Sequence, residues 1–119
     1  MKEFKKKIRI ELLEEADRYF DTLNDKIKSK FFVSFDKTQI GLKGSWFKSI
    51  GSDIWEFKQR DHQKFYRIFA FWDSTEATET LILATSGFDK KTKKTPKAQI
   101  ERAKRIRRKY FENKKNIKG

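Results

Sequence analysis

The chain has 119 residues, a formal net charge of +13, twelve phenylalanines, no cysteine and one histidine. This length fits one domain with an aromatic core, and the missing cysteines exclude disulfides, thiolate metal sites and cysteine nucleophiles. Because no apolar run approaches the ~20 residues of a membrane span and no stretch resembles a signal peptide, we expect a soluble cytoplasmic protein.

The first third of the chain predicts a strand followed by a helical hairpin. Apolar residues alternate over residues 4–10, which is typical of a short strand. Apolar residues at helical spacing then predict a helix from Leu12 to Asn24 and a second helix over Ile27 to Phe35. Residues 36–52 contain three glycines and give no clear element, although they include candidate core residues, Trp46, Phe47 and Ile50.

The middle of the chain predicts three consecutive strands, at residues 54–58, 65–72 and 80–84. Short links between them indicate an antiparallel meander. If the first turn centres on Asp61 and His62, Glu56 faces Arg67 on one side of the sheet, while Trp55 and Phe57 lie on the other. Glu56 and Arg67 could then form an ordinary cross-strand ion pair or part of an anion-binding site.

The positive charge is concentrated at the end of the chain. Residues 1–89 hold 16 Lys/Arg and 15 Asp/Glu, a net of +1, whereas residues 90–119 hold 14 and 2, a net of +12. Lys90, Lys91, Lys93 and Lys94 precede Thr95-Pro96, which predicts the N-cap and first position of a final helix. Lysines beside a helix N-terminus favour phosphate groups. The charge alone fits a solvated tail, nucleic acid, an acidic protein or an anionic membrane, although the modest apolar stripe of this helix disfavours the membrane.

Four motifs in order resemble one known family. They are Ile54-Trp55-Glu56-Phe57, Tyr66-Arg67-Ile68, the segment 87–96 that carries the four lysines, and Ile100-Glu101-Arg102-Ala103-Lys104. Together they resemble the HigB-type, phage-derived branch of the RelE/ParE toxins of type II toxin–antitoxin modules. The strong resemblance covers about residues 52–110, and the first 50 residues agree only in the order of their elements.

The resemblance implies an α+β fold, in which a small curved, mostly antiparallel sheet packs on an N-terminal helical hairpin and carries a basic C-terminal helix. We expect a single RelE/ParE-like domain over residues 1–113 and a basic tail over residues 114–119. The implied function is that of a metal-independent, ribosome-dependent mRNA endoribonuclease without a cofactor. The implied partners are mRNA, the ribosome and a cognate antitoxin with a helix-turn-helix domain, and no membrane.

The resemblance also assigns site residues. Arg67 matches the arginine that clamps the scissile phosphate, Glu56 matches a candidate base, and Lys58 on the same strand face could assist. Lys90, Lys91, Lys93 and Lys94 match the segment that grips RNA. Several relatives place a His or Tyr acid where this chain has Thr85 and Ser86. Two alternatives therefore stay open, a non-catalytic gyrase-inhibitor toxin on the same fold and a plain basic nucleic-acid-binding domain.

Overall fold

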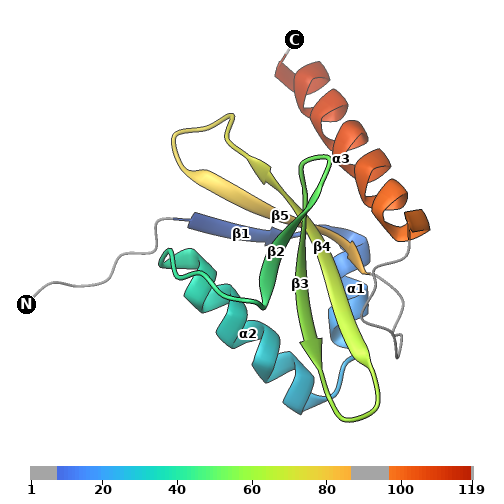
Figure 1. The fold of residues 1–119 in the computed structure, drawn as a ribbon. Coiled ribbons are helices and arrows are strands. Elements are labelled where there is room, and N and C mark those ends of the chain that lie inside the picture. Colours follow the sequence, from blue (N-terminus) through green and yellow to red (C-terminus); the bar gives the residue numbers. More distant parts are fainter. Residues whose placement is uncertain (1–7, 87–96, 119) are drawn as a thin grey trace, which may run out of the picture.

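The computed structural model describes residues 8–86 and 97–118 (Figure 1). In chain order its elements are β1 (Ile8–Leu12), α1 (Glu14–Asp21), α2 (Asp25–Gln39), β2 (Phe47–Gly51), β3 (Ile54–Arg60), β4 (Phe65–Asp73), β5 (Glu79–Ser86) and α3 (Lys97–Lys118). The strands form one open sheet in the order β1-β5-β4-β3-β2. β1 runs parallel to β5 and the other three pairings are antiparallel, so the sheet is mixed and the predicted α+β class is confirmed.

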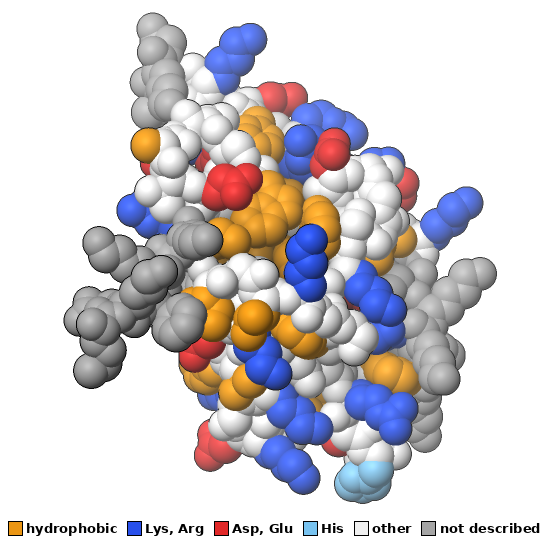
Figure 2. Space-filling model, turned by 60° about the vertical axis from the view of Figure 1, so that its left-hand side comes forward, with side chains coloured by type: hydrophobic (Ala, Val, Ile, Leu, Met, Phe, Trp, Pro, Cys, Tyr) orange, Lys and Arg blue, Asp and Glu red, His pale blue; other side chains and the backbone are white. Residues whose placement is uncertain are grey.

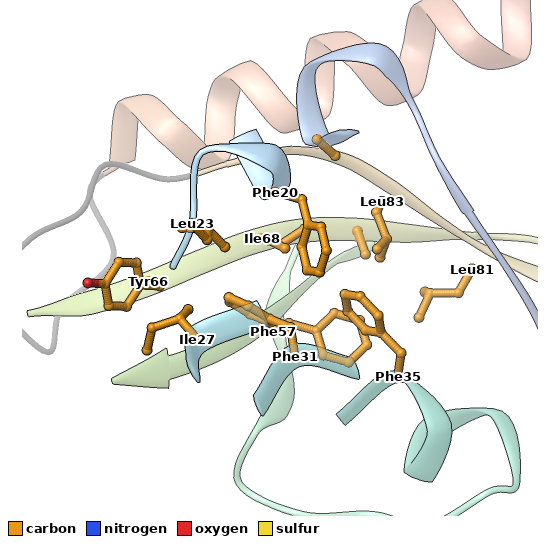
Figure 3. Packing of buried hydrophobic residues seen from close by; sticks show 12 residues of the cluster. Phe20, Leu23, Ile27, Phe31, Phe35, Phe57, Tyr66, Ile68, Leu81 and Leu83 are labelled. Carbon is orange, nitrogen blue, oxygen red and sulfur yellow. The ribbon is translucent and has the colours of Figure 1, made fainter. Parts of the chain in front are cut away.

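The helical hairpin of α1 and α2 covers one face of the sheet, which we call the hairpin face. Its core is rich in phenylalanine, as the composition predicts: in Figure 3 the rings of Phe31, Phe35 and Phe57 lie close together between α2 and the sheet. The centroids of Phe35 and Phe57 are 4.9 Å apart in an edge-to-face arrangement, which adds a specific contact to the buried apolar area. Asn24 begins α2 by accepting a hydrogen bond from the amide of Ile27 at 2.9 Å.

The long basic helix α3 lies on the opposite face, which we call the α3 face (Figure 1). Ala103 is fully buried against the sheet, and Ile106, Tyr110 and Phe111 pack beside it. α3 continues to Lys118, through most of the segment predicted as a tail. The predicted N-cap Thr95 and the four lysines at 90–94 lie outside the described residues. No described helix is both long and apolar enough to cross a membrane.

The structure differs from the sequence prediction in several element boundaries and in one missed strand; α2, for example, continues to Gln39 beyond the predicted end at Phe35. α1 begins at Glu14 rather than Leu12, because Leu12 extends β1 and pairs with Leu83 of β5. β2 was not predicted at all, and it forms a hairpin with β3 through Ser52 and Asp53, which have φ angles of 55° and 63°. Positive φ at two successive residues suits the twist of a tight hairpin, although glycine or asparagine usually supplies it.

Candidate active site

The β3–β4 turn fixes which residues meet at the site. The Asp61 carboxylate accepts hydrogen bonds from the amides of Gln63 and Lys64, at 2.8 and 2.9 Å, and from the Tyr66 hydroxyl at 2.8 Å. The Lys64 amide is the largest influence, and together these bonds lower the pKa of Asp61 to about 2. A charged Asp61 therefore closes a turn that spans residues 61–64.

This turn corrects the predicted register. Its centre lies between His62 and Gln63, so Lys58 pairs with Arg67 and Glu56 pairs with Phe69. The prediction that Glu56 directly faces Arg67 is wrong by a shift of two residues. Because side chains alternate with a period of two, this shift leaves every residue on its predicted face. Phe57 does lie in the core of the hairpin face, and Trp55 stacks on Phe47 on the same face.

Glu56 and Arg67 nevertheless meet, along the diagonal between the two strands on the α3 face. The Arg67 Nε lies 3.3 Å from a carboxylate oxygen of Glu56. The Arg67 residue has no exposed surface and Glu56 is only 5% exposed, so this is a buried ion pair next to the apolar cluster of the α3 face. A buried pair differs from the exposed cross-strand pair considered above, because neither charge is screened by water.

Three cations surround the Phe65 ring: Arg67 of the pair and two neighbouring side chains. The charged groups of Lys58, Arg60 and Arg67 lie 5.6, 5.8 and 5.4 Å from its centroid. These distances fall within the range of cation–π attraction. The third predicted site residue, Lys58, is therefore beside Arg67 and is partly exposed, unlike the pair itself.

The unpredicted strand β2 brings a further cation to the site. Lys48 of β2 pairs directly with Glu56 of β3. Lys48 also lines a hollow of about 270 Å³, together with Lys58, Arg60 and Phe65. No pattern in the sequence indicated Lys48, because the strand that carries it was not predicted.

A second charged cluster fastens α3 to the end of β4. The buried Asp73 carboxylate accepts hydrogen bonds from the Tyr110 hydroxyl at 2.5 Å and from the Lys114 ammonium at 2.6 Å. Thr75 donates two more, from its amide and its hydroxyl. Burial opposes the charged form of Asp73, but these hydrogen bonds outweigh it and hold its pKa well below the usual range. Burial and the Asp73 carboxylate raise the pKa of Tyr110 to about 12.

This Asp73 cluster was missed from the sequence, where residues 73–79 look like a short acidic link. One signal was present: Tyr110 falls on the apolar stripe of its helix, and a buried tyrosine hydroxyl needs a partner.

The other residues that the sequence singled out for the site lie on β5, in the β3–β4 turn or outside the described residues. Thr85 is buried on β5, and His62 is exposed at the hairpin tip. The four lysines at 90–94 lie outside the described residues.

The hairpin face also carries exposed apolar surface. Figure 2 shows a view in which hydrophobic side chains gather near the centre, with Lys and Arg side chains around them. A hollow of about 260 Å³ is lined mainly by apolar side chains, among them Leu42, Phe47, Trp55 and Trp72. The molecule therefore has an apolar hollow on one face of the sheet and a charged site on the other.

The fold and the site together define a small, basic α+β protein with a buried Glu–Arg pair beside a cationic hollow. A family model described as phage derived protein Gp49-like (DUF891) matches residues 18–108. The chain therefore belongs to this phage-derived family, which is toxin-like. No curated protein and no solved structure matches the chain significantly.

Proposed function

We propose that this protein is the toxin of a type II toxin–antitoxin module and acts as a ribosome-dependent mRNA endoribonuclease. The observation that carries the proposal is the meeting of Glu56, Lys58 and Arg67 at one end of the β3–β4 hairpin, in a chain of a toxin-like family. One carboxylate among several cations is the set of groups that metal-independent RNA cleavage needs.

In the proposed reaction the 2′-hydroxyl oxygen of a nucleotide forms a bond to its own 3′-phosphorus, and the bond to the 5′-oxygen breaks. Glu56 takes the proton of the 2′-hydroxyl. Arg67 and Lys58 offset the charge that grows on the phosphoryl oxygens, and a lysine or water returns a proton to the 5′-oxygen. Oriented cations at such a centre contribute roughly 3–4 kcal/mol of transition-state stabilisation each, by analogy with oxyanion donors.

Burial of the pair is the observation that favours a second candidate. Arg67 has no exposed surface, so it touches a phosphate only if the site opens when substrate binds. A protein that binds nucleic acid or gyrase without cleaving anything would keep Glu56 and Arg67 as a structural pair. Lys58 would then be the member of the site that reaches solvent.

The proposal includes a protein partner. A toxin with a net charge of +13 needs an antitoxin that masks its site, and complementary charge provides both rapid and specific recognition. We expect an acidic surface on that antitoxin, and a helix-turn-helix domain by resemblance. Co-expression with the neighbouring open reading frame should relieve growth arrest.

The deciding experiment is to induce the protein in cells and map the 5′ ends of translated mRNA. New ends within translated codons, absent when translation initiation is blocked, support the endoribonuclease. Growth arrest with intact mRNA and with DNA damage supports the gyrase inhibitor instead. Normal growth at high expression, without a copurifying partner, contradicts the toxin assignment altogether.

A further inference from the structure

Two hollows share lining residues at the β2–β3 edge of the sheet. One, of about 430 Å³, is lined by Lys37 among others. The other, of about 270 Å³, is the hollow already described beside Lys58. Both are lined by Trp46 and Gln59, so they form adjoining parts of one surface. We call it the Trp46 surface and define it by Lys37, Trp46, Lys48, Lys58, Arg60 and Phe65.

The Trp46 surface is cationic without local compensation. Lys37, Lys48 and Arg60 are exposed and Lys58 is partly exposed. Within residues 8–86 and 97–118, none of the four forms an ion pair with a carboxylate, and no acidic residue is among the described residues that line the two hollows. Such a surface attracts a polyanion.

Aromatic rings stand among these cations in fixed positions. A Cβ at Gly44 would lie only 1.5 Å from the Trp46 ring, so this glycine allows the indole to pack directly on the backbone. The Lys37 ammonium lies 4.9 Å from the centroid of the same ring. Phe65 has Lys58 and Arg60 beside it. Rings held in place in this way can accept a planar ligand group at little entropic cost.

We propose that the Trp46 surface binds a single-stranded stretch of RNA and leads it to the Glu56–Arg67 pair. Cations that neutralise phosphates, interleaved with rings that stack on bases, are the features of single-strand binding surfaces. An acidic peptide would satisfy the cations but would make no use of the rings. Strand pairing joins the surface to the site, because Lys48 pairs with Glu56 and Lys58 with Arg67. The inference rests on the proposed function for the identity of the strand as RNA.

The charge part of the inference is tested by the binding of a fluorescein-labelled uridine oligomer of about 12 nucleotides, a length within the range of single-strand sites. Its sugars carry 2′-O-methyl groups, so it cannot be cleaved. The variant Lys37→Gln/Lys48→Gln/Arg60→Gln should bind about tenfold more weakly near 0.15 M salt, and its slope of log K against log salt should fall by about two. The matched control, Arg9→Gln/Arg18→Gln/Lys26→Gln, removes three exposed cations that line neither hollow.

The ring part is tested by Phe65→Leu, which keeps apolar volume but removes the stacking face. Binding should weaken about fivefold or more, with an unchanged salt slope. Equal losses in the two charge variants, no binding by the wild type, or full binding by Phe65→Leu would each overturn the inference. The inference would also fail if Lys37→Gln/Lys48→Gln/Arg60→Gln kept its affinity for RNA but no longer copurified with a protein that the wild type binds. Because the oligomer is uncleavable, surface-dependent binding without mRNA cleavage in cells would reject the proposed function and leave this inference standing.

Discussion

At the scale of single residues, Arg67 is the most unusual feature of the molecule. Its guanidinium has no exposed surface, and a carboxylate oxygen of Glu56 lies 3.3 Å from its Nε. Taking two charges out of water costs several kcal/mol per ion, and a well-packed apolar replacement is often equally stable. A fold that needed only stability could therefore have used apolar residues at both positions, and this makes the pair a candidate for a functional role.

The first prediction separates stability from function at this pair. Glu56→Gln removes the charge that balances Arg67 and should lower the free energy of unfolding by roughly 1–3 kcal/mol. It should also reduce the cleavage rate about 10²–10⁴-fold if Glu56 is the base. Glu56→Leu/Arg67→Met should regain the lost stability in urea unfolding, because apolar side chains replace the pair. The double variant should nevertheless fail to arrest growth. Full toxicity in the double variant would show that the pair is structural.

The second prediction concerns Asp61, which sets the strand register. Asp61→Ala removes the acceptor of three hydrogen bonds and should lower the urea midpoint at neutral pH. The pKa of Asp61 is lowered to about 2, so its contribution is present above its ordinary value near 4 and is lost as pH falls toward 2. The difference between wild type and variant should therefore shrink in acid. The control Glu112→Ala removes an exposed carboxylate on α3, and a pH-independent difference at Asp61 would contradict the prediction.

At the scale of elements, the docking of α3 depends on charge as well as on packing. Tyr110 and Lys114 of α3 both donate to the buried Asp73 of β4. Hydrogen bonds to a charged group contribute about 1.5–3 kcal/mol each, more than neutral ones. The C-terminal half of the helix is thus tied to the sheet although it carries mainly basic residues.

The third prediction tests this tie. Asp73→Asn keeps the shape but removes the negative charge, and it should lower the free energy of unfolding by about 2–3 kcal/mol at neutral pH. The pKa of Asp73 is lowered, so its contribution is present above its ordinary value near 4 and is lost as pH falls below that value. Amide hydrogen exchange should then increase in α3 before the β3–β4 hairpin. Glu76→Gln, at an exposed partner of Lys114, is the control and should have little effect. If amide hydrogen exchange increased in all elements at the same time, Asp73 would stabilise the whole fold and not the docking of α3 alone.

The elements also show what could be read from the sequence. The faces of β3 and β4 were predicted correctly because alternation survives a register shift of two residues. The register itself was not predicted correctly, because it depends on how the Asp61 side chain closes the turn. β2 was missed because its five residues alternate weakly and its turn places Ser52 and Asp53 at positive φ. With β2, the position of Lys48 opposite Glu56 was missed as well.

At the scale of the whole molecule, charge is unevenly distributed along the chain. Residues 1–89 carry a net charge of +1 and residues 90–119 carry +12. Among the residues described, the sheet supplies the ion pair whose two side chains are both buried, Glu56 and Arg67, while the terminal segment supplies most of the attraction for a polyanion. Long-range attraction of this kind acts on the rate of association and is screened by salt.

The fourth prediction is that affinity and chemistry can be removed separately. Neutralising Lys90, Lys91, Lys93 and Lys94 together should weaken binding to ribosomes and flatten its salt dependence by about one unit of slope for each lost phosphate contact. Arg67→Lys keeps the charge but not the planar fork, so it should leave ribosome binding nearly intact and still reduce toxicity.

The control for the fourth prediction is Arg105→Gln/Arg108→Gln/Lys109→Gln/Lys115→Gln, which removes four exposed cations from α3. If the lysine cluster makes direct phosphate contacts, the α3 control should lose less affinity and keep a steeper slope, since distant charges are screened beyond a Debye length of ~10 Å at 0.1 M salt. Ribosome co-sedimentation across a salt series measures both quantities. Equal slopes for the two quadruple variants would mean that the lysine cluster acts through net charge alone. If Arg67→Lys lost ribosome binding in proportion to toxicity, affinity and chemistry would not be separable at Arg67.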